Sequence, residues 1–196
     1  MPKNPHTIFV GAALFLAGAG GVSIAADKVS VEASPRGTAV EISARATIKA
    51  PYELIWQTLT DYDHLSDFIP GMEKSHVIER RGSSAIVKQT GSAGVLFFRY
   101  PIEVVVESFE EPPDFIGVRV INGNLKQLDG GYRIEKAGAN LNEYVLRWSG
   151  IIEPSIPVPL FISVPLMQTN ISDQFRGMVS EIERREMLRA IKQARE

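Results

Sequence analysis

Apolar and polar residues alternate along much of this chain, and such alternation is typical of strands with one buried face. From Val40 to Lys49 every second residue is apolar, and the residues between them are charged or carry a hydroxyl group. The same pattern recurs further along the chain. It predicts seven strands, at about 40–49, 72–80, 84–91, 96–109, 114–122, 127–135 and 142–153. Each of these strands would have one face for a core and one for solvent.

Two short helices are expected after the first strand. Pro51 stands where the first turn of a helix accepts proline, and Leu54 and Leu59 contribute to an apolar face, so the pattern predicts a helix that ends near residue 60. A second short helix is predicted at 61–68.

A longer helical signal lies near the C-terminus, where apolar residues recur at intervals of three and four. They are Met167, Ile171, Phe175, Met178 and Ile182. This stripe predicts one long helix from Pro165 to about Ala194. Gly177 lies inside it, where glycine costs about 1 kcal/mol relative to alanine. Either a ligand or a strand approaches this glycine closely, or the glycine is simply tolerated.

The segment before this helix is rich in proline and also very apolar. Four prolines between 154 and 165 predict an extended, irregular connection over 154–164. Its apolar side chains include Ile156, Val158, Leu160 and Phe161. They either cover one end of the core, which is the interpretation we prefer, or form an exposed patch for transient contact with a membrane.

One apolar sheet face and one apolar helix stripe can satisfy each other if the sheet curls around the helix. The order of elements therefore predicts an α+β fold, with a curved antiparallel sheet of about seven strands wrapped around the long C-terminal helix. A cavity is expected wherever the helix and the sheet cannot interdigitate.

The N-terminal 26 residues have the layout of a secretory signal peptide. Lys3 precedes an uncharged, largely apolar stretch from Ile8 to Ala26, and the small residues at its end predict cleavage after Ala25 or Ala26. An uncleaved anchor is the alternative. We therefore divide the chain into a signal peptide (1–26), a polar lead-in (27–37), a ligand-binding domain (38–182) and the charged end of the last helix (183–196). The expected location is the periplasm or the exterior.

The amino-acid composition excludes several classes of protein and of functional site. With 44% hydrophobic and 22% charged residues, the chain has the make-up of a globular domain and lacks the bias of a disordered or multispan membrane protein. The absence of cysteine excludes thiol catalysis and thiolate metal sites. A net charge of -2 gives no clustered positive field, so we expect no nucleic acid partner.

Candidate catalytic groups are few. His64 lies beside Asp61, Asp63 and Asp67, which could form a small acidic metal site, but the spacing matches no familiar zinc or calcium pattern. We interpret these acids as helix-start residues and predict no metal, no cofactor and no catalytic residue. His76 lies on a predicted strand and is interpreted as a hydrogen-bonded or surface histidine.

Three stretches carry a family resemblance. They are Ala50–Trp56, the Asp61–Gly71 stretch DYDHLSDFIPG, and Gly123–Arg133. The chain thereby resembles the START-like polyketide cyclase/dehydrase family (SRPBCC superfamily), which includes the coenzyme Q-binding proteins, over about Thr38 to Ile182. The resemblance implies a helix-grip (START/Bet v 1-like) fold with a pocket for an isoprenoid quinone, another lipid or an aromatic polyketide. It does not fix one activity. We interpret Gly123, Gly130 and Gly131 in the last stretch as turn and bulge positions.

The candidate pocket residues follow from which side chains face inward. Polar candidates are Tyr100, Tyr132, Tyr144 and the indole N–H of Trp148, and apolar candidates are Phe68, Phe98, Trp148, Met167, Ile171 and Phe175. The leading hypothesis is an exported carrier that holds a hydrophobic, lipid-like or quinone-like molecule in this pocket. One alternative is a cyclase, dehydratase or hydrolase acting on an aromatic or polyketide-like substrate. The other is an interaction module with a filled core, in which the charged end 183–196 binds a protein.

Overall fold

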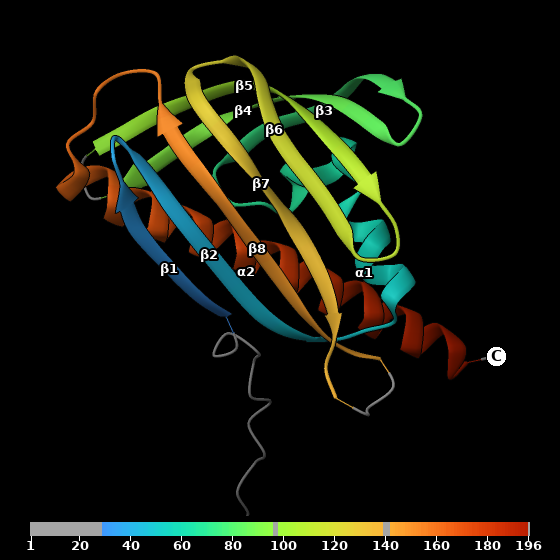
Figure 1. The fold of residues 1–196 in the computed structure, drawn as a ribbon. Coiled ribbons are helices and arrows are strands. Elements are labelled where there is room, and N and C mark those ends of the chain that lie inside the picture. Colours follow the sequence, from blue (N-terminus) through green and yellow to red (C-terminus); the bar gives the residue numbers. More distant parts are fainter. Residues whose placement is uncertain (1–28, 96–97, 139–141, 196) are drawn as a thin grey trace, which may run out of the picture.

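A computed structural model describes residues 29–95, 98–138 and 142–195, which form one curved sheet and a long helix beneath it (Figure 1). The predicted signal segment lies outside the described residues. The elements are β1 (Val29–Arg36), β2 (Ala39–Lys49), α1 (Tyr52–Leu59), η2 (Tyr62–Asp67), β3 (Met72–Arg81), β4 (Ser84–Val95), β5 (Phe98–Glu111), β6 (Phe115–Gly123), β7 (Leu125–Lys136), β8 (Glu143–Pro154) and α2 (Leu160–Gln193).

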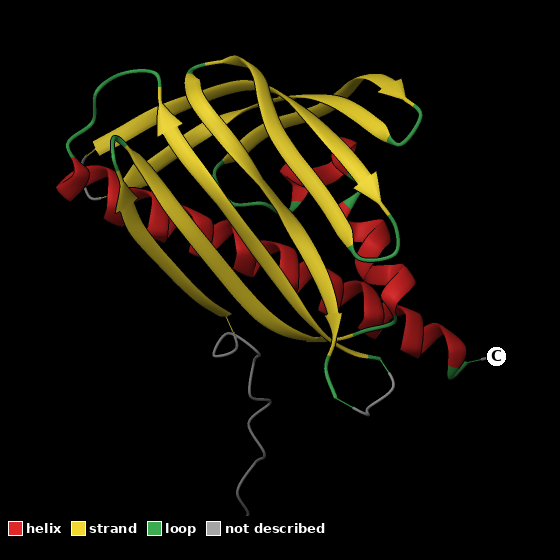
Figure 2. Cartoon of the chain, viewed as in Figure 1, coloured by secondary structure: helices red, strands yellow, loops and turns green. Residues whose placement is uncertain are grey.

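The sheet is antiparallel throughout, with the strand order β1-β2-β8-β7-β6-β5-β4-β3. Consecutive strands from β3 to β8 pair with their neighbours, and β8 returns to β2. The sheet curls over α2, whose C-terminal end projects beyond it (Figure 2). The predicted α+β helix-grip fold is confirmed. No described helix is long and apolar enough to cross a membrane.

The described sheet has eight strands, one more than predicted. The additional strand, β1, occupies most of the segment that we predicted only as a polar lead-in. Its half-buried residues Val29, Val31 and Ala33 alternate with more exposed ones, but the run of apolar residues is short and ends at Pro35. Proline is tolerated on an edge strand because one side of such a strand needs no backbone donor.

The long helix begins at Leu160, so the prediction that it starts at Pro165 was wrong. Pro159 precedes its first residue, and Pro165 lies inside the helix. A proline there removes the backbone donor to the carbonyl four residues earlier, that of Phe161. Phe161 belongs to the exposed first turn, where water can satisfy this carbonyl. The predicted apolar stripe is confirmed, since Met167, Phe175, Met178 and Ile182 are buried and Ile171 is half-buried.

The absence of a side chain at Gly177 allows α2 to approach the segment between η2 and β3 closely. A Cβ atom at this position would lie 2.5 Å from the Phe68 carbonyl oxygen and 2.6 Å from Pro70 Cδ. A close approach is therefore observed, but the neighbour is this connecting segment and not the ligand or strand that we expected.

Glycines also allow the middle of the sheet to bend. Gly117 on β6 pairs with Gly131 on β7, and Gly130 pairs with Gly150 on β8. Gly130 and Gly131 lie in the middle of a strand, so their interpretation as turn and bulge positions was wrong. Gly123 does end β6, with a φ of 124° that favours glycine.

Candidate functional site

A cavity of about 230 Å³ lies between the concave face of the sheet and α2. Its wall contains inward-facing residues of β4 to β8, the N-terminal half of α2 and residues of η2 and the adjoining loop. Gly91–Ala93 on β4, Pro154 at the end of β8 and Val158 before α2 also line the cavity. The helix and the sheet therefore leave the space that we expected between them.

Six of the eight predicted pocket residues line this cavity. They are Tyr100, Tyr132, Trp148, Met167, Ile171 and Phe175. Phe68 does not line it and instead lies in a charged groove on the outer side of η2. The side chain of Phe98, the first residue of β5, is outside the part of the chain that the structure describes. Tyr144 is not in the wall and lies near Tyr52, with ring centroids 6.3 Å apart.

Two tyrosines in the wall have different environments. The Tyr100 hydroxyl donates a hydrogen bond to the Asn124 carbonyl oxygen at 2.7 Å, so its donor is already used. Tyr132 stacks on Phe175, with ring centroids 6.5 Å apart and planes 6° apart, and no described residue hydrogen-bonds its hydroxyl. Burial raises the pKa of Tyr132 to about 12. The Tyr132 hydroxyl therefore remains neutral at physiological pH and can hydrogen-bond a bound molecule.

Glycines increase the space near these aromatic rings. Trp148 lies directly opposite Tyr132 on the neighbouring strand. A Cβ atom on Gly150 would lie 3.0 Å from the Trp148 ring. Gly130 and Gly150 share the inward face with Tyr132 and Trp148 because residues two apart on a strand face the same side. Two adjacent inward positions thus carry no side chain.

Several polar wall residues were not predicted. Tyr62 is buried, and its hydroxyl donates to Glu110 Oε1 at 3.2 Å, while the Arg80 guanidinium lies 5.6 Å from its ring centre. Burial raises the pKa of Tyr62 above its ordinary value. Ser108 donates to the Gly117 carbonyl oxygen at 3.4 Å. The inward orientation of Tyr62 depends on the 3-10 helix η2, which has no simple periodicity in the sequence.

Ser163 is the other unpredicted wall residue. It is the fourth residue of α2, is 1% exposed, and its hydroxyl has no hydrogen-bond partner among the described residues. The sequence analysis placed Ser163 in an irregular segment, so its burial could not be inferred from helical spacing.

None of the described residues in the cavity wall is an aspartate, glutamate, lysine, arginine or histidine. The wall consists of aliphatic and aromatic side chains with a few hydroxyl and amide groups. Such a surface can remove an apolar molecule from water and orient it with a few hydrogen bonds.

Charged side chains instead gather in the groove beside η2, which is lined by Asp61, His64, Asp67, Phe68, Glu181, Arg184 and Arg185. Arg185 contacts Asp61 at 2.8 Å and Glu181 at 2.7 Å, and it lies over the Phe68 ring. Partial burial opposes the ionisation of Asp61, but hydrogen bonds from His64 and Arg185 outweigh it and lower the pKa of this carboxyl.

The role of this groove is structural, because its ion pairs connect α2 to η2. The hydrogen bond to Asp61 raises the pKa of His64. Among the described residues, no group of three histidine or acidic side chains could hold a metal ion.

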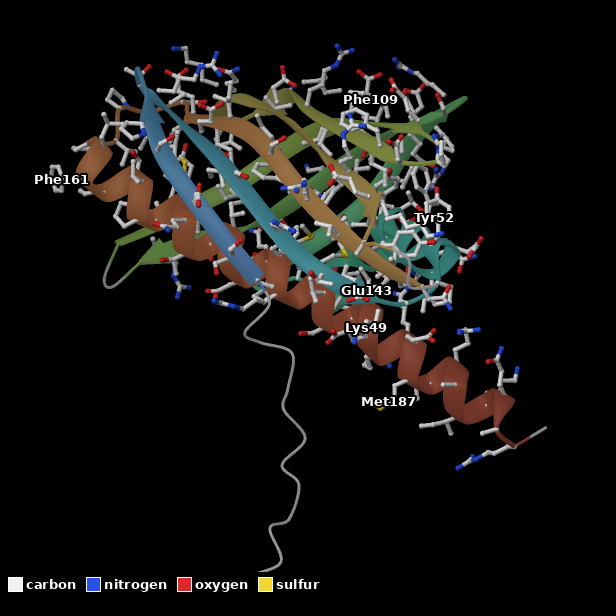
Figure 3. All side chains as sticks on the ribbon, turned by 60° about the horizontal axis from the view of Figure 1, so that its bottom comes forward. Lys49, Tyr52, Phe109, Glu143, Phe161 and Met187 are labelled. Atoms are coloured by element: carbon white, nitrogen blue, oxygen red, sulfur yellow. The ribbon has the colours of Figure 1, made fainter. Side chains whose placement is uncertain are left out.

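The apolar residues just before and at the start of α2 are more exposed than the interpretation that we preferred would require. Phe161 is 80% exposed, Ile156 is 54% exposed and Leu160 is 37% exposed, whereas Val158 is half-buried and lines the cavity. Figure 3 shows Phe161 at the N-terminal end of α2 and Met187 near the opposite end. The preferred interpretation, in which this segment is buried as a cover of the core, was wrong for these three side chains.

Comparisons with known proteins match this geometry. The sequence pattern of one family, described as polyketide cyclase/dehydrase and lipid transport, matches residues 48–190. No curated protein sequence matches the chain.

Solved structures with a similar fold come from several bacteria. A START superfamily protein from Mycobacterium smegmatis has a TM-score of 0.64 and 13% identity, over 74% of this chain and 97% of its own. A STAR-related lipid transfer protein from Xanthomonas axonopodis has a TM-score of 0.65 and 12% identity, over 80% and 94%. The Zhui aromatase/cyclase from Streptomyces sp. R1128 has a TM-score of 0.59 and 16% identity, over 75% and 95%. At such identities the likeness shows the fold alone.

Proposed function

This chain belongs to the polyketide cyclase/dehydrase and lipid transport family, and we propose from that premise that it is an exported carrier of a lipid-like or quinone-like molecule. The observation that carries the proposal is the cavity between the sheet and α2, whose described wall is apolar and contains no charged side chain. Enclosing an apolar chain there would contribute about 0.8 kcal/mol for each buried methylene. A few such groups give useful affinity even after the cost of association.

The exposed apolar residues just before and at the start of α2 support a contact with membranes in this proposal. Ile156, Leu160 and Phe161 are exposed, and the adjoining Val158 lines the cavity. An apolar patch beside a cavity edge would allow a lipid to pass from a bilayer into the protein without crossing water. Export rests on the layout of residues 1–26 and is tested by N-terminal sequencing of the protein recovered from the periplasm and the medium.

The cyclase or dehydratase alternative is less well supported. Acid and base groups in the described wall would have to be tyrosines, such as Tyr132. With its pKa raised to about 12 by burial, Tyr132 would release its proton poorly at neutral pH. The family and the fold include both lipid transfer proteins and aromatase/cyclases by name, so turnover of an aromatic polyketide by the purified protein remains the direct test of this alternative.

The first experiment identifies the cargo. The chain from residue 27 is expressed in a bacterium that makes quinones and lipids, and the purified protein is extracted under denaturing conditions for mass spectrometry. A stoichiometric lipid or quinone supports the carrier. An empty extract, together with no thermal shift from a panel of such molecules, contradicts it.

A cavity-filling variant connects the cargo to this cavity. Ile171→Trp should reduce the co-purified ligand strongly because residue 171 lines the cavity, and Ile171→Phe should reduce it less. Met187→Trp is the matched control, since residue 187 is exposed on the same helix. Urea unfolding checks that each variant folds. Full ligand occupancy in folded Ile171→Trp would place the cargo elsewhere.

Membrane contact is tested separately by flotation with phosphatidylcholine and phosphatidylglycerol vesicles. Phe161→Ser should weaken vesicle binding by about tenfold, because it removes one large side chain from the contact. Met187→Ser, at the other end of α2, should bind as the parent does (Figure 3). Equal losses in both variants would contradict a specific patch at Phe161.

A further inference from the structure

The cavity wall contains a buried hydroxyl without a partner. Ser163 Oγ on α2 is enclosed, and no described residue accepts or donates a hydrogen bond to it. The carbonyl that a helical serine usually bonds, four residues earlier, is that of Pro159, which already accepts the backbone N–H groups of Ile162 and Ser163 at 2.9 Å each. A buried polar group left unpaired is destabilising, and most such groups in proteins have a partner.

Four other polar wall residues are already paired. The hydroxyls of Tyr62, Tyr100 and Ser108 donate to protein oxygens. Asn170 Nδ2 donates to the carbonyl oxygens of Gly94 and Leu166. These groups shape the wall but have their donors occupied.

Five further wall residues also have no side-chain hydrogen bond to a described residue; they are Thr90, Ser92, Tyr132, Trp148 and Gln174. Two of them, Tyr132 and Trp148, lie opposite each other on β7 and β8. Hydroxyl and amide groups can donate or accept, whereas an indole N–H can only donate. Each of these side chains can donate a hydrogen bond, so an acceptor oxygen on a bound molecule can satisfy it.

The charge of the ligand follows from the rest of the wall. A carboxylate, phosphate or ammonium group buried in the cavity would meet no opposite charge among the described wall residues. Burying an ion without a partner is far more costly than burying a neutral polar group. A carbonyl oxygen, in contrast, needs only one or two donors.

Building on the proposed function, we propose that the buried part of the ligand is a neutral, mainly apolar molecule with a carbonyl-type acceptor oxygen, and that Ser163 donates a hydrogen bond to it. Tyr132 and Trp148 offer a second donor position on the sheet side of the same cavity. The proposed class of ligand includes ketones, esters and similar uncharged carbonyl compounds. It excludes molecules whose charged group would have to enter the cavity.

The test uses four small probes of similar size. Butylbenzene is purely apolar, butyrophenone adds a carbonyl oxygen, phenylbutyrate carries a negative charge and phenylbutylammonium carries a positive charge. Binding to the mature chain is measured by isothermal titration calorimetry. We expect butyrophenone to bind more tightly than butylbenzene by about threefold to tenfold, the factor of one hydrogen bond to a neutral acceptor. Both ions should bind much more weakly than butylbenzene.

Ser163→Ala should reduce the preference for butyrophenone over butylbenzene, because it removes one hydrogen-bond donor from the cavity wall. The matched control is Ser180→Ala, because Ser180 is exposed on the same helix and does not line the cavity, and it should keep the preference. Since Ser163→Ala removes an unpaired group, its urea midpoint should be equal to that of the parent or higher.

The outcomes separate this inference from the function on which it rests. Equal binding of butylbenzene and butyrophenone, or an unchanged preference in Ser163→Ala, would overturn the role of Ser163 and leave an apolar carrier standing. Phenylbutyrate or phenylbutylammonium binding as tightly as butyrophenone would overturn the neutral class. Failure of all four probes to bind would contradict the proposed carrier function itself.

Discussion

Replacing Gly177 with alanine should destabilise the protein, although the same change stabilises most helices. Gly177 lies in the middle of α2, against the segment that joins η2 to β3. The new Cβ atom would lie 2.5 Å from the Phe68 carbonyl oxygen and 2.6 Å from Pro70 Cδ, where ordinary contacts begin near 3.4 Å. One obstacle is backbone and the other is a proline ring, so neither can move aside by changing a rotamer.

Two opposing contributions decide the size of the effect. Alanine gains about 1 kcal/mol over glycine in a helix interior. Insertion of a methyl group into a closely packed contact costs about 1 to 3 kcal/mol, because the backbone must shift. The shift would also move Leu65 and Ile69, which line the cavity. Because both contacts would be shorter than 3.0 Å, the cost lies in the upper part of this range, and we expect a net loss of about 1 to 2 kcal/mol in the free energy of unfolding.

Urea unfolding followed by circular dichroism measures this loss, and thermal melting should show a decrease of about 2 to 4 °C in Tm for each kcal/mol. Ser180→Ala is the control, because Ser180 is exposed on the same helix, and this change should be neutral or slightly stabilising. A Gly177→Ala protein as stable as the parent, with Ser180→Ala behaving as expected, would refute the close packing described for α2.

Three further predictions use the same unfolding assay. Phe175→Ala should lose about 3 to 5 kcal/mol, because Phe175 is 2% exposed and lies in the core; a loss below about 1 kcal/mol would contradict this packing. Gly117→Ala should destabilise the sheet because its Cβ would overlap the Phe109 ring, and a Phe109→Ala background should remove most of that effect. The hydrogen bond from Arg184 lowers the pKa of Glu181 despite burial, so this carboxylate stabilises the fold above its ordinary pKa and ceases to do so as the pH falls through the lowered value. Glu181→Gln should therefore have a lower urea midpoint than the parent at neutral pH and the same midpoint in strong acid, and a constant difference across this range would contradict the ion pair.

The parts of the fold that could be predicted are those in which one face of an element is buried. Alternation identified β2 to β8, and the spacing of Met167, Phe175 and Ile182 identified α2, because burial of one face requires those periods. The edge strand β1 was missed because it needs few apolar residues and tolerates Pro35. The start of α2 was missed because Pro159 and Pro165 predict an interruption, whereas packing of the first two turns overrides it.

The residues of the candidate site also fall into two groups, those that the sequence could predict and those that it could not. Residues such as Ile171 and Phe175 could be assigned to the cavity because their helix faces the sheet along its whole apolar stripe. Tyr62 could not, because its position depends on a contact with Glu110, which is 48 residues away. Ser163 could not, because its orientation depends on a helix start that proline content conceals. Periodicity identifies which face of an element is buried, but not how loops and irregular turns dock on that face.

No described charged side chain lines the cavity, because the charged contacts of α2 lie further along the helix. The last α2 residue in the wall is Met178, whereas Glu181 and Arg185 form ion pairs in the next turns, and Arg185 reaches Asp61 on the η2 side. The C-terminal half of α2 is thus held by charge as well as by apolar packing.

The N-terminal half of α2 is held less tightly to the sheet. Among the described side chains of this half, only Gln168 and Asn170 hydrogen-bond other elements, at the carbonyl oxygens of Val31 and Gly94. Displacement of this end of the helix would break those two bonds and separate apolar surfaces, but it would break no ion pair. The same end carries the exposed Phe161, and the acyl chains of a bilayer can cover apolar side chains that the sheet no longer covers. The proposed carrier would therefore open most readily at the proposed membrane contact, because a bilayer would keep the separated surfaces out of water.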